Sequence, residues 1–366
     1  MKKVLITGFS GQDGYLMASY LLRNTENLIV CGIRRVVRGD ISDPEDLLSD
    51  ERIRLIDLDV TDQINVERVI SEENPDYFIN FAANSFVGNS WAMPINHMET
   101  NFMSVIYQLE AIKKHAPFCR YYNAGSSEQF GDVDYSPQDI NHPFKPRSPY
   151  GVSKCAAHHA VKVWRESYNL YAVQGILFNH EGVRRGPEFV TRKITKNVVR
   201  IWWEIGANKS ITPLELGNLS ARRDWSDSED FVEGVWRMLN QKEFEIEHLE
   251  SKTGAEVALP DYKPKDYVLS SGETRSIREF VEEAFRVVGI EGIWVGKDEG
   301  EKFLHSGKAD GSQILVEVNP EFYRPAEVEL LCGDSTPARE ELGWEPKTSF
   351  KELVKKMVME DMDCIV

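Results

Sequence analysis

Short apolar runs alternate with longer segments of helical periodicity along the first 125 residues. Apolar runs of this length are typical of buried strands, and apolar positions three and four residues apart are typical of helices. Strands that alternate with helices predict a parallel sheet covered by helices on both faces. We expect strands at 3–7, 28–34, 77–82 and 120–124, and helices at 14–24, 64–73 and 101–114.

The later part of the chain has a less regular pattern. Ser148-Pro149 opens the most periodic segment, a helix expected over 150–168, because proline is favoured in the first helical turn. The pattern becomes irregular beyond residue 182. The charged stretch 241–265 indicates a surface insertion between a helix expected at 231–239 and a strand expected at 267–269.

Three glycines follow the first expected strand at G-x-x-G-x-x-G spacing. A glycine turn between a strand and a helix presents backbone N–H groups and a helix N-terminus to a pyrophosphate. We therefore expect an α/β fold. A Rossmann-type doubly wound parallel sheet comprises mainly residues 1–182, and a smaller C-terminal α/β substrate-binding part comprises mainly residues 183–366. The chain can cross back between these two parts. The turn assigns these residues to a dinucleotide: Gly8, Ser10, Gly11, Gln12, Asp13 and Gly14.

Arg34 and Arg35 end the second expected strand, where an acidic residue would hold a ribose 2′-hydroxyl. Guanidinium groups suit a 2′-phosphate instead, which favours NADP and leaves NAD possible. Arginines at this position are also common as solvated surface residues.

Tyr150 and Lys154 are four residues apart and share one face of the expected helix. A lysine there is expected to lower the tyrosine pKa from its usual value of about 10, giving a base that works near neutral pH. The motif by itself is weak, but Ser126 and Glu128 follow the strand 120–124, at the edge where ligands of parallel sheets bind. We expect these four side chains to converge.

Composition narrows the function classes. The formal net charge of −16 disfavours binding to nucleic acid or anionic lipid, and no apolar stretch approaches the 18 residues of a membrane span. The five cysteines are scattered without C-x-x-C spacing, and His158-His159 and Asn179-His180-Glu181 lack a metal-ligand pattern. We expect a cytoplasmic protein with reduced thiols, no metal and activity that survives chelators.

The chain resembles the GDP-mannose 4,6-dehydratases and related GDP-sugar 4,6-dehydratases over most of its length. The resemblance is carried by ITG at 6–8, GQDG at 11–14, PRSPYG at 146–151, RESY at 165–168, GILFNHE at 175–181, RRG at 184–186, FVTRKI at 189–194, LGNL at 216–219, RDW at 223–225 and YRPAEV at 323–328.

This resemblance implies an enzyme that forms a 4-keto-6-deoxy sugar with an internally recycled hydride, in a homodimer or homotetramer. It implies that Ser126 stands for a catalytic threonine and that Glu128, Tyr150 and Lys154 are catalytic. The further cofactor contacts that it implies are Asp59, Val60, Ala82, Ala83, Ser85, His180 and Arg185. The implied GDP-sugar contacts are Ser85, Ser126, Glu128, Asn179, Lys193, Leu216, Gly217, Arg223, Arg324 and Glu327.

Two segments depart from the family pattern. Phe86, Gly88 and Asn89 replace a small, His-rich loop, so GDP-N-acetylglucosamine stays beside GDP-mannose as a candidate donor. Val36 and Val37 replace Arg and Ser after the second strand, which affects both the NADP preference and the tetramer contacts.

Other functions remain open at this stage. A nucleotide-sugar C4 epimerase or reductase needs the Tyr150/Lys154 pair but gives Glu128 no chemistry. A non-catalytic dinucleotide-binding regulator needs only the glycine turn.

Overall fold

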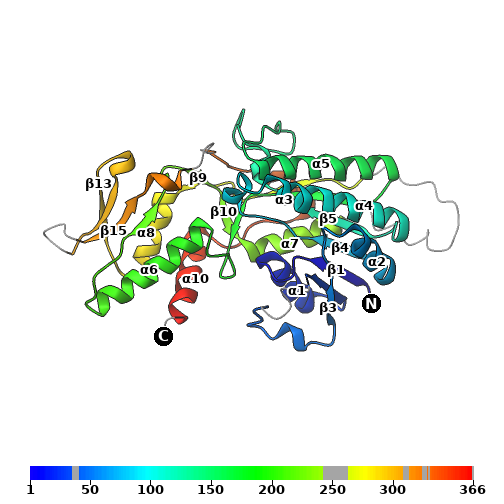
Figure 1. The fold of residues 1–366 in the computed structure, drawn as a ribbon, viewed down its shortest axis with the longest axis horizontal. Coiled ribbons are helices and arrows are strands. Elements are labelled where there is room, and N and C mark those ends of the chain that lie inside the picture. Colours follow the sequence, from blue (N-terminus) through cyan, green and yellow to red (C-terminus); the bar gives the residue numbers. More distant parts are fainter. Residues whose placement is uncertain (35–40, 242–262, 308–312, 324–327, 329, 365–366) are drawn as a thin grey trace.

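The computed structural model describes residues 1–34, 41–241, 263–307, 313–323, 328 and 330–364. Figure 1 shows two lobes that meet in the middle of the molecule: one contains β1, β4 and β5 with flanking helices, and the other contains α6, α8, β13 and β15.

The first lobe is built on a seven-stranded parallel sheet in the order β11-β6-β5-β4-β1-β2-β3. The strands are β1 Lys3–Thr7, β2 Leu28–Ile33, β3 Ile53–Asp57, β4 Tyr77–Asn80, β5 Arg120–Ala124, β6 Ala172–Leu177 and β11 Tyr267–Leu269. The strand order reverses between β1 and β4, and ligands of such sheets bind beyond the carboxyl ends of the strands at that point. The predicted doubly wound α/β sheet is confirmed.

Helices cover both faces of this sheet because successive strand residues point to opposite sides. Val4 and Ile6 pack in one core beneath α1 and α7, whereas Leu5 belongs to the core beneath α2, α4 and α5. These helices are α1 Gln12–Asn24, α2 Gln63–Glu73, α4 Ser104–His115, α5 Pro149–Tyr168 and α7 Ser228–Leu239.

One predicted helix differs in its start. The segment expected over 101–114 continues a helix that begins earlier, as α3 Pro94–Met98 and a π-helical turn at Glu99–Met103. Proline at the first position of α3 starts this helix, and a π-turn has no distinct periodic signal in the sequence.

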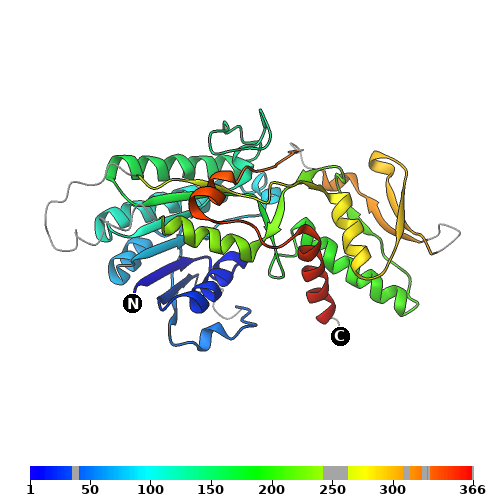
Figure 2. The same cartoon turned by 180° about the vertical axis from the view of Figure 1, so that it is seen from behind.

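The second lobe packs three helices on a four-stranded sheet in the order β13-β14-β15-β8. Its elements are β8 Leu214–Leu216, β13 Gly292–Val295, β14 Lys302–His305, β15 Ile314–Val318, α6 Val190–Gly206, α8 Ile277–Val287 and α10 Phe350–Asp363. Figure 2 shows this lobe from behind, with α8 and α10 side by side, as their contacts require.

The chain passes between the lobes more than once. After α6 it returns through α7 and β11 to the large sheet, and α9 Thr336–Leu342 packs on the same lobe before α10. Two short pairs lie at the junction: β7 Asn179–Glu181 with β10 Trp225–Asp227, and β9 Arg222–Arg223 with β12 Arg275–Ser276. Most of the predicted insertion 241–265 lies outside the described residues.

Candidate active site

A cavity of about 970 Å³ lies where the two lobes meet, beyond the carboxyl ends of the parallel strands. It brings together all the predicted site residues that the structure describes. They are Gly8, Ser10, Gly11, Gln12, Asp13, Gly14, Arg34, Asp59, Val60, Ala82, Ala83, Ser85, Ser126, Glu128, Tyr150, Lys154, Asn179, His180, Arg185, Lys193, Leu216, Gly217 and Arg223. Arg35, Arg324 and Glu327 lie outside the described residues.

The turn between β1 and α1 leaves no room for a side chain at Gly8 or Gly14. Gly8 has φ +74°, and a Cβ atom there would lie 2.8 Å from the backbone nitrogen of Ala82. A Cβ atom at Gly14 would lie 2.7 Å from Cα of Phe9. The turn therefore brings bare backbone and the N-terminus of α1 to the cavity, as a pyrophosphate site needs.

A half-buried ion pair joins the turn to β7 at the junction of the lobes. The Nε2 atom of His180 lies 2.9 Å from Asp13 Oδ2, and Gln12 donates to the backbone oxygen of His180 at 3.1 Å. Burial acts against both charges, but the pairing prevails: the pKa of His180 is raised and that of Asp13 is lowered.

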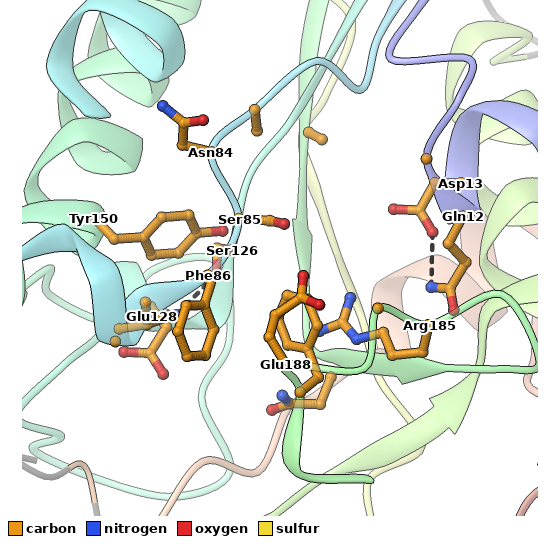
Figure 3. A pocket seen from close by; sticks show the side chains of 18 of the residues that line it. Gln12, Asp13, Asn84, Ser85, Phe86, Ser126, Glu128, Tyr150, Arg185 and Glu188 are labelled. Atoms are coloured by element: carbon orange, nitrogen blue, oxygen red, sulfur yellow. Dashed lines mark hydrogen bonds between the residues drawn. The ribbon is translucent and has the colours of Figure 1, made fainter. Parts of the chain in front are cut away.

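Arg185 also lines the cavity, on the side of Gln12 and Asp13 in Figure 3. Its guanidinium is 3.1 Å from the Glu181 carboxylate and 3.5 Å from the centre of the Phe189 ring. Arg34 at the end of β2 also lines the cavity and is exposed. Cationic groups therefore lie at two places along the cavity where phosphates would bind favourably.

Ser126 and Glu128 are held by a short helical turn after β5. The Ser126 hydroxyl accepts from the backbone N–H of Glu128 at 3.3 Å, and the Ser126 backbone N–H donates to Gln129 Oε1 at 2.9 Å. This capping box satisfies the end of the turn and leaves the half-buried Glu128 carboxylate facing the cavity. Figure 3 shows Ser126, Glu128 and Tyr150 on the same side of the pocket.

Tyr150 and Lys154 come from the first turns of α5 and are almost fully buried. Burial raises the pKa of Tyr150 to about 12, although a hydrogen bond with Ser126 acts in the opposite direction. Lys154 donates to the Ala124 backbone oxygen at 2.7 Å, and its Nζ lies 5.8 Å from the Tyr150 ring centre. The prediction of a lowered tyrosine pKa is therefore wrong for the protein alone, because desolvation by burial outweighs the influences that lower this pKa.

The second lobe supplies the other end of the cavity. Lys193 on α6 places its ammonium 3.8 Å from the centre of the Phe322 ring, and burial lowers the pKa of Lys193. Gly217 lies so close to Phe322 that a Cβ atom would be 2.7 Å from the phenylalanine backbone oxygen. The Lys193 ammonium and the Phe322 ring are thus in contact, and both line the cavity together with Gly217.

Several cavity residues were not predicted from the sequence. Three of them lie within or next to the motifs 189–194 and 323–328: Phe189, Phe322 and Tyr323. The motifs pointed to these segments but did not assign a role to these side chains. Arg184 lies within the motif 184–186, but the motif does not indicate its tertiary contacts: it donates to the Ser42 backbone oxygen at 2.9 Å and lies over the Tyr15 ring.

A metal centre finds no support in the part of the chain that the structure describes, where no group of three or more His, Cys, Asp or Glu side chains is placed to hold an ion. Among the same residues, no helix is long and apolar enough to cross a membrane. All five cysteines are free thiols.

The fold and the cavity define a dinucleotide-binding α/β protein of the extended short-chain dehydrogenase type. The model of the family "GDP-mannose 4,6 dehydratase" matches residues 5–259 and 250–357, and the chain belongs to this family. Similar curated relatives include GDP-mannose 4,6-dehydratases of Drosophila melanogaster, 38% identical over 99% of this chain and 86% of the relative, and of Vibrio cholerae serotype O1, 37% identical over 99% and 94%. The human GDP-mannose 4,6-dehydratase is 36% identical over 98% of this chain and 91% of its own.

Solved structures with the same fold are more distant in sequence. A UDP-glucose 4-epimerase from Thermotoga maritima, solved with UDP-glucose, has a TM-score of 0.75 at 18% identity and covers both chains fully. A dTDP-glucose 4,6-dehydratase from Bacillus anthracis, solved with NAD, has a TM-score of 0.75 at 18% identity over 98% of this chain and 96% of that one. At this identity the likeness establishes the fold.

Proposed function

We propose that this protein is a nucleotide-sugar 4,6-dehydratase that converts a GDP-hexose to its GDP-4-keto-6-deoxy derivative with the loss of one water. The observation that carries the proposal is a carboxylate, Glu128, in the same cavity as Tyr150, Ser126 and Lys154, in a chain of this family. Simple oxidation at C4 needs the tyrosine and the lysine. Elimination of water needs one more acid–base group.

NADP fits the cavity, with NAD as the alternative. The backbone cradle at Gly8 and Gly14, which a Cβ atom would fill, and the N-terminus of α1 suit a pyrophosphate. We assign the adenosine end to Arg34, Arg35, Asp59 and Val60, and the pyrophosphate and nicotinamide end to residues of both lobes. These are Ser10, Gly11, Gln12, Asp13, Ala82, Ala83, Ser85, Tyr150, Lys154, His180 and Arg185. A dinucleotide held by these residues would supply reversible hydride transfer, by which the hexose C4 is oxidised and C6 is later reduced.

Tyr150 is the group that takes the proton from the C4 hydroxyl in this scheme. Its raised pKa means that it is a neutral phenol near pH 7 in the protein alone, and its phenolate needs a nearby positive charge. Burial lowers the pKa of Lys154 to about 8, so this lysine is still mostly protonated at pH 7 and provides one such charge. Ser126 donates to the oxygen on which negative charge develops.

Glu128 carries the dehydration. Once C4 is a ketone, the C5 proton is acidic, and the Glu128 carboxylate removes it. The protonated Glu128 then gives its proton to the C6 hydroxyl, the C6–O bond breaks, water leaves, and a C5=C6 double bond conjugated with the ketone remains. Protonation at C5 completes the 4-keto-6-deoxy sugar after C6 is reduced.

The second lobe holds the nucleotide in this proposal. Lys193 and Arg223 suit the diphosphate, and Leu216, Gly217, Phe322 and Tyr323 form a wall for the base. We extend this site to Asn179, Arg324 and Glu327 from the family resemblance. The donor is GDP-mannose or GDP-N-acetylglucosamine.

The organisation of the protein follows from the same assignment. We propose a dinucleotide-binding domain mainly at 1–182 and a GDP-sugar-binding domain mainly at 183–366, with α7, β11 and α9 crossing back. The outer face of α5 exposes Val152 and Val163, at 46% and 50%, which favours a homodimer or homotetramer. Five unpaired cysteines favour a reducing, cytoplasmic location.

The test is to incubate the purified protein, loaded with NADP or NAD, with a panel of GDP-hexoses. The expected result is a product 18 mass units lighter than one of the hexoses, trapped as a 4-ketone by borohydride. A product of unchanged mass with an inverted C4 would instead identify an epimerase. No change in any GDP-hexose would overturn the proposal.

A further inference from the structure

Two phenylalanine rings meet across the cavity, one from each lobe. Phe86 lies in the loop after β4, and Phe189 is the N-cap residue of α6. Their ring centres are 5.8 Å apart and the rings are nearly perpendicular, at 80°, the edge-to-face arrangement that aromatic pairs favour. We call this pair the aromatic bridge.

Each ring of the aromatic bridge is supported from behind. The Phe86 ring rests on Gly88, where a Cβ atom would lie 3.0 Å from the ring carbon Cζ, and its backbone oxygen accepts from Asn89 at 3.2 Å. The Phe189 ring is covered by the Arg185 guanidinium at 3.5 Å. The two rings are therefore held in place by local structure on both lobes.

The aromatic bridge lies beside the groups assigned to the dehydration. Phe86 and Phe189 line the same cavity as Glu128 and Tyr150. In Figure 3 the Phe86 ring projects into the pocket, between Glu128 on one side of the view and Arg185 on the other. Phe86 is 37% exposed, so much of an apolar ring faces the cavity. An apolar surface beside a carboxylate that acts on C5 and C6 keeps water away from that end of the hexose.

We propose that Phe86 and Phe189 are positioning residues that exclude bulk water from the C5–C6 edge of the sugar while the double bond exists. This inference rests on the proposed dehydratase function. A C5=C6 bond conjugated with a C4 ketone is attacked by water at C6: the water oxygen bonds to C6, a proton adds at C5, and the 4-keto-hexose with its 6-hydroxyl is regenerated. That reaction reverses the elimination and competes with formation of the 6-deoxy product.

The test follows solvent oxygen into the sugar. The holoenzyme turns over the active GDP-hexose in water enriched in ¹⁸O, the mixture is reduced with borohydride, and mass spectrometry measures ¹⁸O in the fragment that contains C6. Phe86→Ala and Phe189→Ala are compared with the unsubstituted protein and with Phe118→Ala, which removes an exposed phenyl ring outside the cavity. Phe86→Leu keeps an apolar side chain and serves as the conservative variant.

The expected result is a several-fold rise of C6-bound ¹⁸O for each alanine variant, relative to 6-deoxy product formed. Phe86→Leu should restore most of the protection, and Phe118→Ala should match the unsubstituted protein. Equal C6 labelling in Phe86→Ala, Phe189→Ala and the unsubstituted protein would overturn the inference, even if the alanine variants turn over slowly. If an alanine variant does not fold, as shown by thermal melting, Phe86→Asn or Phe189→Asn replaces it, because asparagine fills more of the space but offers a polar surface to water. Failure of the unsubstituted protein to form any 6-deoxy product would instead overturn the proposed function on which the inference rests.

Discussion

The two walls of the cavity are built in different ways. The sheet wall comprises the glycine turn, the end of β5 and the start of α5, and its polar groups are fixed by backbone. Lys154 donates to a main-chain oxygen, and Ser126 closes a capping box. The lobe wall comprises β7, the loop into α6, β8 and residues 320–323, and its cations rest on aromatic rings: Arg185 on Phe189 and Lys193 on Phe322.

This difference suits the sheet wall to catalysis and the lobe wall to substrate binding. Buried hydrogen bonds to backbone hold a group in one position, as acid–base catalysis requires. A cation–π contact contributes only about 0.5–2 kcal/mol, so a phosphate can replace the ring as partner of Lys193 or Arg185. We therefore expect substitutions in the sheet wall to reduce kcat, and substitutions in the lobe wall to raise KM.

The largest effect is expected for Tyr150→Phe. Losing the phenol oxygen removes the group that takes the C4 hydroxyl proton, so kcat should fall by about 10²–10⁴-fold with little change in KM. Steady-state kinetics with the active GDP-hexose measures both constants. Tyr135→Phe, which loses an exposed hydroxyl bonded to Asp139, is the matched control. A Tyr150→Phe variant that folds and keeps its kcat would contradict the assignment of catalysis to the sheet wall.

A smaller effect, on KM and not on kcat, is expected for Lys193→Met. Methionine keeps an unbranched side chain near Phe322 but cannot bind a phosphate, so KM should rise about tenfold, the equivalent of one charged contact, while kcat changes little. Lys209→Met is the control, because Lys209 also lies over a ring, that of Trp203, but outside the cavity. A fall in kcat at constant KM would contradict the division between the two walls.

The smallest effect concerns the ion pair between the walls. The raised pKa of His180 gives stability that is complete below about pH 6.5 and is lost as pH rises through the folded value. The lowered pKa of Asp13 gives stability that is complete above about pH 4 and is lost as pH falls through its folded value. Above about pH 6.5, the free energy of unfolding measured with denaturant should therefore fall as pH rises in the unsubstituted protein. In His180→Gln the same pH range should produce a flatter curve, and parallel curves for the two proteins would show that the pair contributes nothing.

The sheet wall is the part that the sequence predicts well. Buried parallel strands have near-continuous apolar runs, so the strands Lys3–Thr7, Arg120–Ala124 and Tyr267–Leu269 were predicted with their observed bounds. The glycine turn was predictable because the positive φ of Gly8 and the close approach of Gly14 to Phe9 are requirements within the turn itself.

The lobe wall and the electrostatics of the site were less predictable. The contacts Phe86–Phe189 and Lys193–Phe322 join residues 103 and 129 positions apart, and no periodic pattern encodes such pairs. The pKa of Tyr150 was predicted in the wrong direction because helical spacing shows the lysine but not the depth of burial. Desolvation is a property of the packed protein.

In the proposed reaction, Glu128 performs the step that distinguishes dehydration from oxidation. The most direct measurement is product analysis of Glu128→Gln with the active GDP-hexose, with thermal melting as the check on folding. Glutamine is nearly the same size but cannot accept the C5 proton, so the account predicts a 4-keto hexose of unreduced C6, with water loss reduced at least about 100-fold. Water loss at the rate of the unsubstituted protein would contradict the account.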